Sequence, residues 1–440
     1  MSDVRSFGAV GDGRADDTEA LEHALRDGEG VLLFDRGDFR ISRTIVVDLA
    51  KSGRTGLVGL GGTARVVMAG PGPAFKFLGT HLLGTADPES FDPQFWSRQR
   101  MPLVENLEIV GDHPEADAIE AEGTMQLTVS RVRISRCRHG VRLVNRNRNL
   151  LVSDCHIYDN SGIGVFYDHV SLHQSNIVGS HISYCRGGGV VCRGGDVRNV
   201  HIGTCDLESN HDPQGPPTAN LLIDCSGSTN GTAEVAVTGC TIQHNSESPD
   251  SANIRILGRG DEGKNGRSQW GHVTITGNVL SDVAVNVHLR GCRDVTLTGN
   301  TFWMGFEHNL LVEDCCGIAA GHNTLGRNPA YAYGKSATAK NAVVFRDSRD
   351  CVVGGLYVQG VHTAEAAVVV ERCDRFNVSG CTIIDNDNAG LLLRGTTRSR
   401  VSGCIVRDDR PDATSASIRA VECRDCTIEG NTTSTPPEGV

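Results

Sequence analysis

The chain has 440 residues, and its 42 lysines and arginines against 53 aspartates and glutamates give a formal net charge of −11. Such an acidic chain is not expected to be a general binder of nucleic acids or of anionic membranes. With 53 glycines, 5% aromatic residues and many segments rich in Val, Ile, Leu and Thr, the composition favours short strands joined by tight turns and excludes a helical bundle.

Residues 15–27 combine acidic residues and Thr at their start with an apolar face formed by Ala20, Leu21, Ala24 and Leu25. This pattern is typical of an amphipathic helix. A stack of strands leaves the backbone of its first strand unpaired, and such an edge aggregates unless it is covered. We expect this helix and the first strands, within residues 1–50, to cap the stack that follows.

From about residue 103 the chain repeats one pattern: alternating apolar positions, a small or polar pair, a Cys or Asn, and then an Ile or Leu before a polar turn. Residues 152–157 (Val-Ser-Asp-Cys-His-Ile), 237–242 and 378–383 are copies, and the Cys or Asn recurs at intervals of 22, 23, 27 or, with an insertion, 35 residues. Such periods indicate stacked units. The period-two alternation, with no Leu-x-x-Leu-x-Leu frame and no helical half-repeat, favours a right-handed parallel β-helix over a leucine-rich horseshoe.

The sequence therefore predicts an all-β solenoid of about a dozen coils, a single domain over residues 1–440 with its coils in residues 51–435. The Cys or Asn of each repeat is expected to face inward, where Asn bonds to its counterpart one coil away and Cys packs as a small apolar residue. Four segments are too long for plain turns and are expected to wall a groove or contact another subunit. They are residues 79–101, 210–219, 258–271 and 326–341.

The chain has an N-terminal signature in four parts: residues 7–13 (Phe-Gly-Ala-Val-Gly-Asp-Gly), the Asp-Asp-Thr of residues 16–18, the following helix and the apolar residues 31–34. In this signature and in its repeats the chain resembles the pectate-lyase-like superfamily. The resemblance implies a β-helix that acts on carbohydrate, but it implies no particular reaction, because one fold hosts many chemistries.

Aligning the repeats on their buried Ile or Leu places Ile157, Ile182, Leu207 and Ile242 in one inward column. The flanking residues then point outward from one wall, with successive coils ~4.8 Å apart. This outward set is rich in imidazole, phenol and carboxylate groups. We predict catalytic roles for Asp206, Glu208 and His181, and substrate-binding roles for His156, Tyr158, Asp159, Tyr184, Arg186, His211, Asp212 and His244.

Asp206 and Glu208 are two residues apart on one predicted strand, so their carboxyl groups share a face. In a glycosidase, one such carboxyl group acts as the acid and the other as the nucleophile or base. The two groups lie ~5 to 5.5 Å apart in enzymes that retain the configuration of the sugar and ~6.5 to 9.5 Å apart in enzymes that invert it. His181, one coil away, would stabilise the ionised carboxylate. Residues 195–199 and Glu208 also resemble a stretch of the inulin fructotransferases, which are trimeric β-helix enzymes, and this resemblance implies Asp196 as the acid partner of Glu208.

Two other functions stay open. A polysaccharide lyase or epimerase acting on uronate-containing glycans needs a base, an acid and a cation, and His156 or His181, Tyr158 or Tyr184, and Arg186 would fill these roles. A non-catalytic glycan-binding β-helix is the other alternative. The expected partner in every case is an oligo- or polysaccharide, without nucleic acid or membrane.

No metal or other cofactor is expected, because Cys423 and Cys426 form a lone Cys-x-x-Cys and His169 and His173 have ligand spacing only on a helix. The sixteen cysteines are scattered, and neither a secretory signal nor ~18 to 20 consecutive apolar residues are present. We therefore expect reduced thiols and a cytoplasmic protein, or a secreted one if a signal precedes this sequence. Flat β-helix walls also favour an oligomer, and we expect a homotrimer.

Overall fold

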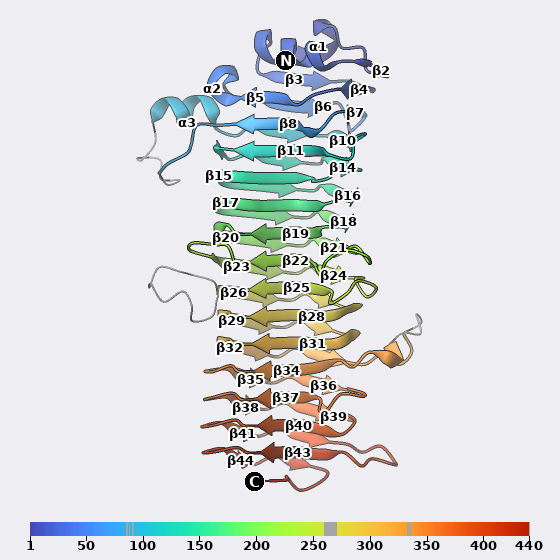
Figure 1. The fold of residues 1–440 in the computed structure, drawn as a ribbon, viewed down its shortest axis with the longest axis vertical. Helices are drawn as coiled ribbons and strands as arrows, with labels where there is room; N and C mark the ends of the chain where they lie inside the picture. Colours follow the sequence, from blue (N-terminus) through green and yellow to red (C-terminus); the bar gives the residue numbers. More distant parts are fainter. Residues whose placement is uncertain (85–86, 88, 90–91, 259–270, 332–335, 440) are drawn as a thin grey trace. The chain divides into compact units, whose positions relative to one another are not determined.

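The computed structural model describes residues 1–84, 87, 89, 92–258, 271–331 and 336–439. Contacts divide the chain into two compact units, Met1–Asp212 with Gly227–Thr232, and Pro213–Ser226 with Ala233–Val440. In both units the strands are parallel and follow one another as the coils of a β-helix (Figure 1). The predicted fold is confirmed, and the extent of a single domain stays a prediction.

Each coil of the first unit contributes to three walls, and two long strands, β15 (Val141–Ser153) and β17 (Ile163–Val178), bend from the first wall into the second. The other strands of the first wall are β5 (Ile45–Asp48), β8 (Gly72–Leu78), β11 (Ala116–Glu122) and β19 (Gly188–Arg193). The second wall also holds β1 (Ser2–Asp3), β3 (Val31–Phe34), β6 (Gly56–Gly59), β9 (Leu103–Glu105), β12 (Thr124–Met125), β13 (Thr128–Ser130) and β20 (Asp196–Gly203). The third wall consists of β2 (Asp12–Asp16), β4 (Gly37–Ile41), β7 (Ala64–Met68), β10 (Leu107–Gly111), β14 (Arg133–Ser135), β16 (His156–Asn160), β18 (His181–Cys185) and β21 (Asp206–Glu208).

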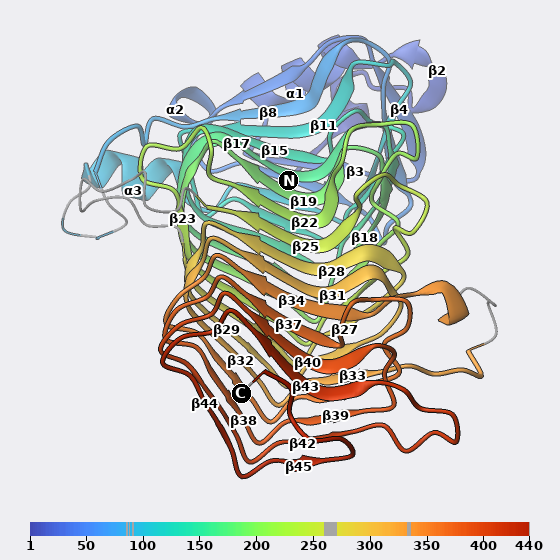
Figure 2. The same cartoon turned by 60° about the horizontal axis from the view of Figure 1, so that its bottom comes forward.

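The second unit repeats the three-walled coil, and Figure 2 shows its last turn, in which β43, β44 and β45 form the three sides. Its first wall holds β22 (Ala219–Asp224), β25 (Ala252–Leu257), β28 (Val283–Arg290), β31 (Gly305–Glu313), β34 (Ala342–Arg346), β37 (Val368–Glu371), β40 (Ala389–Arg394) and β43 (Ala416–Val421). The second wall holds β23 (Thr232–Thr238), β26 (Gly271–Thr276), β29 (Arg293–Thr298), β32 (Cys316–Gly321), β35 (Val352–Gly354), β38 (Asn377–Ser379), β41 (Arg400–Ser402) and β44 (Thr427–Glu429). The third wall holds β24 (Thr241–Gln243), β27 (Val279–Leu280), β30 (Thr301–Phe302), β33 (Thr324–Gly326), β36 (Tyr357–Gln359), β39 (Thr382–Ile384), β42 (Ile405–Arg407) and β45 (Thr432–Thr433).

The predicted capping helix is α1 (Thr18–Asp27), which buries Leu21 and Ala24 completely at the N-terminal end of the first unit. It begins three residues later than expected because residues 12–16 form β2, paired with β4. The side chain of Asp17 does not cap the helix; it accepts hydrogen bonds from the backbone of residues 10 and 11 at 2.6 and 3.1 Å.

The other helical segments whose bounds fall within the described residues are short: η1 (Val4–Phe7), α2 (Leu49–Ser52), α3 (Pro93–Gln99) and η4 (Ser336–Thr338). Two of them lie in segments that were expected to be long loops, α3 in 79–101 and η4 in 326–341. The expected loop 258–271 lies almost wholly outside the described residues. No helix in the described part of the chain is long and apolar enough to cross a membrane.

Asparagine ladders run through the interior of the second unit, as the repeat predicts. Asn278 donates its side-chain amide to Asn300 at 3.0 Å, and Asn300 donates in turn to Asn323 at 2.9 Å. All sixteen cysteines are free, and thirteen of them are buried. The marker residues therefore serve the packing of the coils, asparagine through hydrogen bonds and cysteine as a small apolar group.

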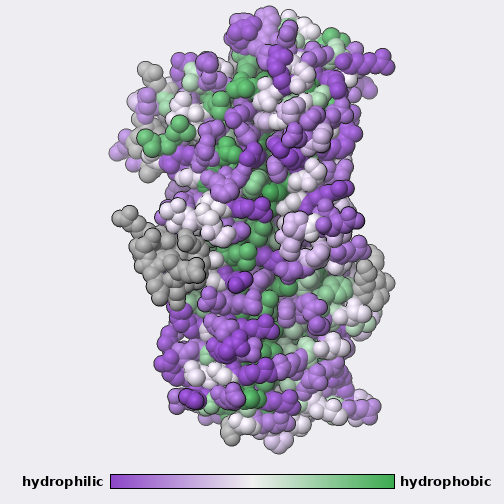
Figure 3. Space-filling view, viewed as in Figure 1, coloured by the Kyte–Doolittle hydropathy of each residue, from purple (hydrophilic) through white to green (hydrophobic). Residues whose placement is uncertain are grey.

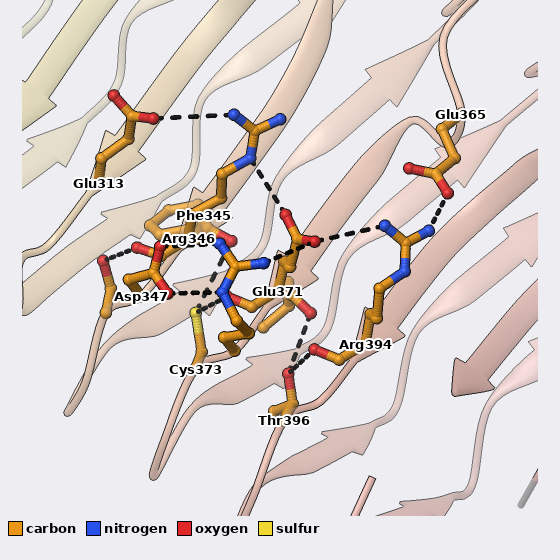
Figure 4. Close-up of polar contacts among 12 residues, drawn as sticks. Glu313, Phe345, Arg346, Asp347, Glu365, Glu371, Cys373, Arg394 and Thr396 are labelled. Atoms are coloured by element: carbon orange, nitrogen blue, oxygen red, sulfur yellow. Dashed lines mark hydrogen bonds and ion pairs between the residues drawn. The ribbon is translucent and has the colours of Figure 1, made fainter. Parts of the chain in front are cut away.

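The outer face of the second unit carries charges that alternate in sign from coil to coil. Glu313, Arg346, Glu371 and Arg394 are in register on β31, β34, β37 and β40. Figure 4 shows this charge ladder, in which Glu371 lies 3.2 Å from Arg346 and 3.4 Å from Arg394. On the face seen in Figure 3 such hydrophilic side chains predominate. Like charges would repel at this spacing, so alternation stabilises the stack.

Candidate functional site

The third wall of the first unit aligns the predicted site residues. Ile157, Ile182 and Leu207 pair in register and are completely buried. Because side chains alternate along a strand, their neighbours on both sides point outward. One outward column reads Arg133, His156, His181 and Asp206, and the next reads Ser135, Tyr158, Ser183 and Glu208. The predicted alignment over residues 156–208 is thus confirmed.

The tightest group on this wall is His181, Asp206 and Glu208. The Nε2 atom of His181 lies 2.8 Å from Oδ2 of Asp206 and 4.0 Å from Oε2 of Glu208. All three side chains are partly open to solvent, with exposed fractions of 42%, 40% and 23%. An imidazole can therefore orient or stabilise either carboxylate while the carboxylates remain within reach of a ligand.

His156 and Tyr158 border this group on the preceding coil. The imidazole rings of His156 and His181 are 6.0 Å apart between centroids. Arg133 lies over the Tyr158 ring, 5.0 Å from its centroid, and also donates a hydrogen bond to its hydroxyl group.

Asp159 and Tyr184 are the penultimate residues of β16 and β18, and both have a left-handed backbone conformation with φ of 55°. At these corners the chain turns from the third wall toward the first, so the two side chains lie at the border of the wall rather than on its flat face. Tyr184 is 54% exposed. Arg186 is also exposed, and its backbone N–H donates to the carbonyl of Asn160 at 3.0 Å.

A polar pocket of about 250 Å³ lies on the same wall, next to Tyr158. In its lining, Glu108 forms ion pairs with Arg65 at 2.9 Å and with Arg133 at 2.5 Å. The full lining is Arg65, Glu108, Val110, Arg133, Ser135, Arg136, Tyr158 and Asp159. Three arginines against two carboxylates leave a net positive lining on an acidic protein, which suits an anionic ligand.

The sequence interpretation missed these arginines because Leu107 and Val132 occupy the marker position that Cys155 occupies one coil later. Extending the inward column backward to Ile134 would have found Arg133 and Arg136, whereas Arg65 flanks Val66, which lies before the long segment 79–101.

One predicted site residue, Asp196, lies on another wall of the first unit. Asp196 begins β20 of the second wall, where its carboxylate accepts hydrogen bonds from the backbone and side chain of Asn230 at 2.7 and 3.2 Å. Asp196 thus lies on the second wall and Glu208 on the third, and their pairing, which the resemblance implied, stays a prediction. His211 and Asp212 follow β21 in a bend that ends the long segment of the first unit.

His244 belongs to the second unit. There its Nδ1 atom lies 3.7 Å from Oδ2 of Asp282. Its predicted membership of the site in the first unit stays a prediction.

Among the described residues, one set of three metal-ligating side chains has its donor atoms within 4.8 Å of one another: His181, Asp206 and Glu208. The combination of one imidazole and two carboxylates could hold a divalent cation. Cys423 and Cys426, which are partly exposed, have no third ligand of this kind in the described chain.

Comparison with known proteins supports the fold described above. A family model described as a right handed beta helix region matches residues 95–207, which include the strands of the candidate site. No curated protein sequence matches the chain. The chain thus has the fold of a right-handed parallel β-helix, as its repeats predicted, and the N-terminal resemblance to the pectate-lyase-like superfamily agrees with this fold.

Among solved structures, the Dettilon tailspike protein is similar at 12% identity and a TM-score of 0.50, over 96% of this chain and 67% of that chain. The A-module of the mannuronan C-5 epimerase AlgE6 from Azotobacter vinelandii is similar at 14% identity and a TM-score of 0.45, over 99% and 100% of the two chains. The catalytic unit of an α-1,3-glucanase from Streptomyces thermodiastaticus is similar at 14% identity and a TM-score of 0.46, over 99% and 69%. At these identities the similarity concerns the fold alone.

Proposed function

We propose that the protein is a carbohydrate-active enzyme that cleaves or transfers glycosidic bonds on the third wall of its first unit. The observation that carries this proposal is the outward placement of Asp206 and Glu208 on one strand, with His181 of the neighbouring coil 2.8 Å from Asp206. A rigid strand holds both carboxyl groups in one orientation, which paired acid catalysis requires.

The separation of the carboxyl groups favours one of the two glycosidase geometries. Their nearest oxygen atoms lie within 4.8 Å. Retaining enzymes hold their carboxyl groups ~5 to 5.5 Å apart, whereas inverting enzymes need ~6.5 to 9.5 Å to admit a water molecule. We therefore propose a retaining reaction, in which one carboxylate attacks the sugar and the other protonates the leaving oxygen. A covalent intermediate of this kind also permits transfer to a second hydroxyl group instead of water.

His181 assigns the two roles in this proposal. Its contact with Asp206 is the shorter one, so the imidazole orients the carboxylate of Asp206 more closely than that of Glu208. Asp206 is then the nucleophile and Glu208 the proton donor.

The test is incubation with a panel of neutral glycans, fructans and uronate polymers, followed by analysis of the released or transferred sugars. Glu208→Gln is expected to abolish turnover while the far-ultraviolet circular dichroism stays unchanged. Glu115→Gln, a change at an exposed carboxylate before the first wall, is the matched control and should retain full activity. Unchanged turnover in Glu208→Gln would refute the proposal.

One observation favours a second function, β-elimination or epimerisation of a uronate. The pocket lined by Arg65, Arg133 and Arg136 offers cations for a sugar carboxylate on the coils next to His156. In that reaction a histidine removes the C5 proton, and an arginine stabilises the negative charge that develops on the carboxylate. Elimination produces an unsaturated uronate that absorbs ultraviolet light, and epimerisation incorporates deuterium at C5 from heavy water. Either signal, retained in Glu208→Gln, would favour this second function. The cytoplasmic location and the homotrimer stay predictions.

A further inference from the structure

We propose that His181, Asp206 and Glu208 form a binding site for a divalent transition-metal cation. This inference concerns the same wall as the proposed function, but it does not depend on that function. It rests on three features of the cluster: the spacing of its donor atoms, the absence of hydrogen bonds at two of them, and the rigidity of the strands that carry them.

The spacing of the donor atoms suits one cation. Ligand atoms that each lie ~2.1 Å from a metal are ~3.0 Å apart when cis in an octahedron, ~3.4 Å apart in a tetrahedron and ~4.2 Å apart when trans. Nε2 of His181 is 2.8 Å from Oδ2 of Asp206, close to the cis value, and 4.0 Å from Oε2 of Glu208, close to the trans value. The widest pair, within 4.8 Å, needs only a small side-chain rotation to close on an ion.

Two of the donor groups carry polar atoms without a hydrogen bond. Nε2 of His181 and Oδ1 of Asp206 are shielded from solvent and have no hydrogen-bond partner. The 2.8 Å contact between the two side chains therefore does not have hydrogen-bond geometry, although its length would allow one. Leaving a buried polar atom without a partner is unfavourable. A cation between the two side chains would accept the nitrogen lone pair and a carboxylate oxygen together.

The backbone fixes the positions of all three residues before any ligand binds. His181 pairs with Asp206 across β18 and β21, and Glu208 is two residues further along β21 on the same face. The completely buried Ile182 and Leu207 anchor the two strands between them. Sites built on strands keep their geometry better than sites built on loops.

The donor set also predicts which metal is preferred. An imidazole nitrogen suits Zn²⁺, Mn²⁺ or Fe²⁺, whereas Ca²⁺ and Mg²⁺ favour sites made of oxygen atoms alone. Three protein ligands on a partly exposed wall leave coordination positions open to solvent. This is the arrangement of sites that bind a further ligand, in contrast to the closed four-ligand sites of structural zinc.

Cation binding and paired acid catalysis exclude each other at these atoms. A carboxylate held by a metal is kept ionised and cannot donate a proton, so an occupied site would inhibit a retaining glycosidase. For this reason the cation is tested by direct binding, without any sugar present.

The experiment is a titration of the full chain with Mn²⁺ at neutral pH, with free Mn²⁺ measured by electron paramagnetic resonance. Manganese is the probe because thiols bind it weakly, so Cys423 and Cys426 do not contribute. We expect one saturable Mn²⁺ per chain. His181→Ala and Asp206→Asn should each weaken binding at least tenfold, whereas His156→Ala, which removes the neighbouring exposed imidazole, should leave it unchanged.

Competition and folding controls complete the test. Zn²⁺ should displace Mn²⁺ at a lower concentration than Ca²⁺ does, because sites with a nitrogen ligand bind Zn²⁺ more tightly than Mn²⁺. Circular dichroism and thermal unfolding establish that the variants are folded. The site is refuted if no saturable binding occurs, if His181→Ala binds as the unmodified chain does, or if Ca²⁺ competes as well as Zn²⁺. Binding without glycosidase activity would refute only the proposed function, and activity without binding would refute only the cation site.

Discussion

Replacing Asn300 by Ala should destabilise the second unit more than any exposed substitution on the same coil. The side chain of Asn300 is 1% exposed and makes four hydrogen bonds. Its amide donates to the carbonyl of Ile275 at 3.0 Å and to the side chain of Asn323 at 2.9 Å. Its carbonyl oxygen accepts from the backbone and the side chain of Asn278, both at 3.0 Å.

The expected magnitude follows from what the substitution leaves behind. A typical hydrogen bond contributes ~0.5 to 1.5 kcal/mol net, and an orphaned buried group costs ~1 to 3 kcal/mol. Asn300→Ala removes the side-chain partner of the Asn278 backbone N–H and one partner of the Ile275 carbonyl. We expect the free energy of unfolding to fall by about 3 to 5 kcal/mol.

Asn300→Cys is a useful second variant, because cysteine also occurs naturally at this marker position, as Cys240 does on the coil next to Asn278. A cysteine sulfur can accept a backbone N–H from the next coil, as Cys315 does from Cys292 at 3.3 Å. We therefore expect Asn300→Cys to lose about half as much stability as Asn300→Ala.

The measurement is unfolding in guanidinium chloride followed by far-ultraviolet circular dichroism, with the slope compared between variants to exclude a change in the unfolded state. Thr296→Ala, on the exposed face of β29, is the control and should change stability by less than ~0.5 kcal/mol. If Asn300→Ala and Thr296→Ala unfold at the same midpoint, the asparagine ladder does not stabilise the coils.

Three further outcomes are expected. Burial lowers the pKa of His308 from 6.5 to about 4, so the unfolded chain binds more protons than the folded chain between these pH values. The free energy of unfolding should therefore fall as the pH drops through that window, by up to ~1.4 kcal/mol per pH unit. His308→Gln should reduce the slope of stability against pH, and an unaltered slope would refute the assignment. Glu371→Gln weakens contacts to two arginines of the charge ladder and should lower the free energy of unfolding in urea by ~1 to 2 kcal/mol. The control Glu365→Gln, at an exposed carboxylate, should lower it by less than ~1 kcal/mol, and equal effects would contradict the role of the ladder. A thiol reagent should label three cysteines in the native protein and all sixteen only after denaturation, as mass spectrometry of the labelled peptides would show; the three are Cys316, Cys423 and Cys426.

Much of the fold could be predicted because each coil repeats the same physical requirement. The alternation of apolar residues defines strands, and the fixed interval between marker residues defines the stacking that buries them. The capping helix was placed three residues too early because Asp16 and Asp17 look like a helix start in the sequence. In the structure, Asp16 ends β2 and Asp17 instead binds the backbone of residues 10 and 11.

The site could be predicted only as far as strand register determines it. Register brings His181, Asp206 and Glu208 to one face, since Ile182 and Leu207 must point inward. The side-chain rotations that bring a histidine nitrogen 2.8 Å from Asp206 do not follow from register, so the sequence offered an acid pair but no metal site. The corner at residues 194–195 places Asp196 on the second wall, and whether it acts with Glu208 stays a prediction.

The asparagine ladder also restricts how the gene of this protein can change in length. One added codon within β29 would turn every later side chain of that strand from inside to outside. Duplication of a complete turn, or growth of a loop at a corner, leaves Asn278, Asn300 and Asn323 facing their counterparts. Homologues of different length should therefore differ by whole turns or by corner loops, and hardly ever by single residues inside a wall.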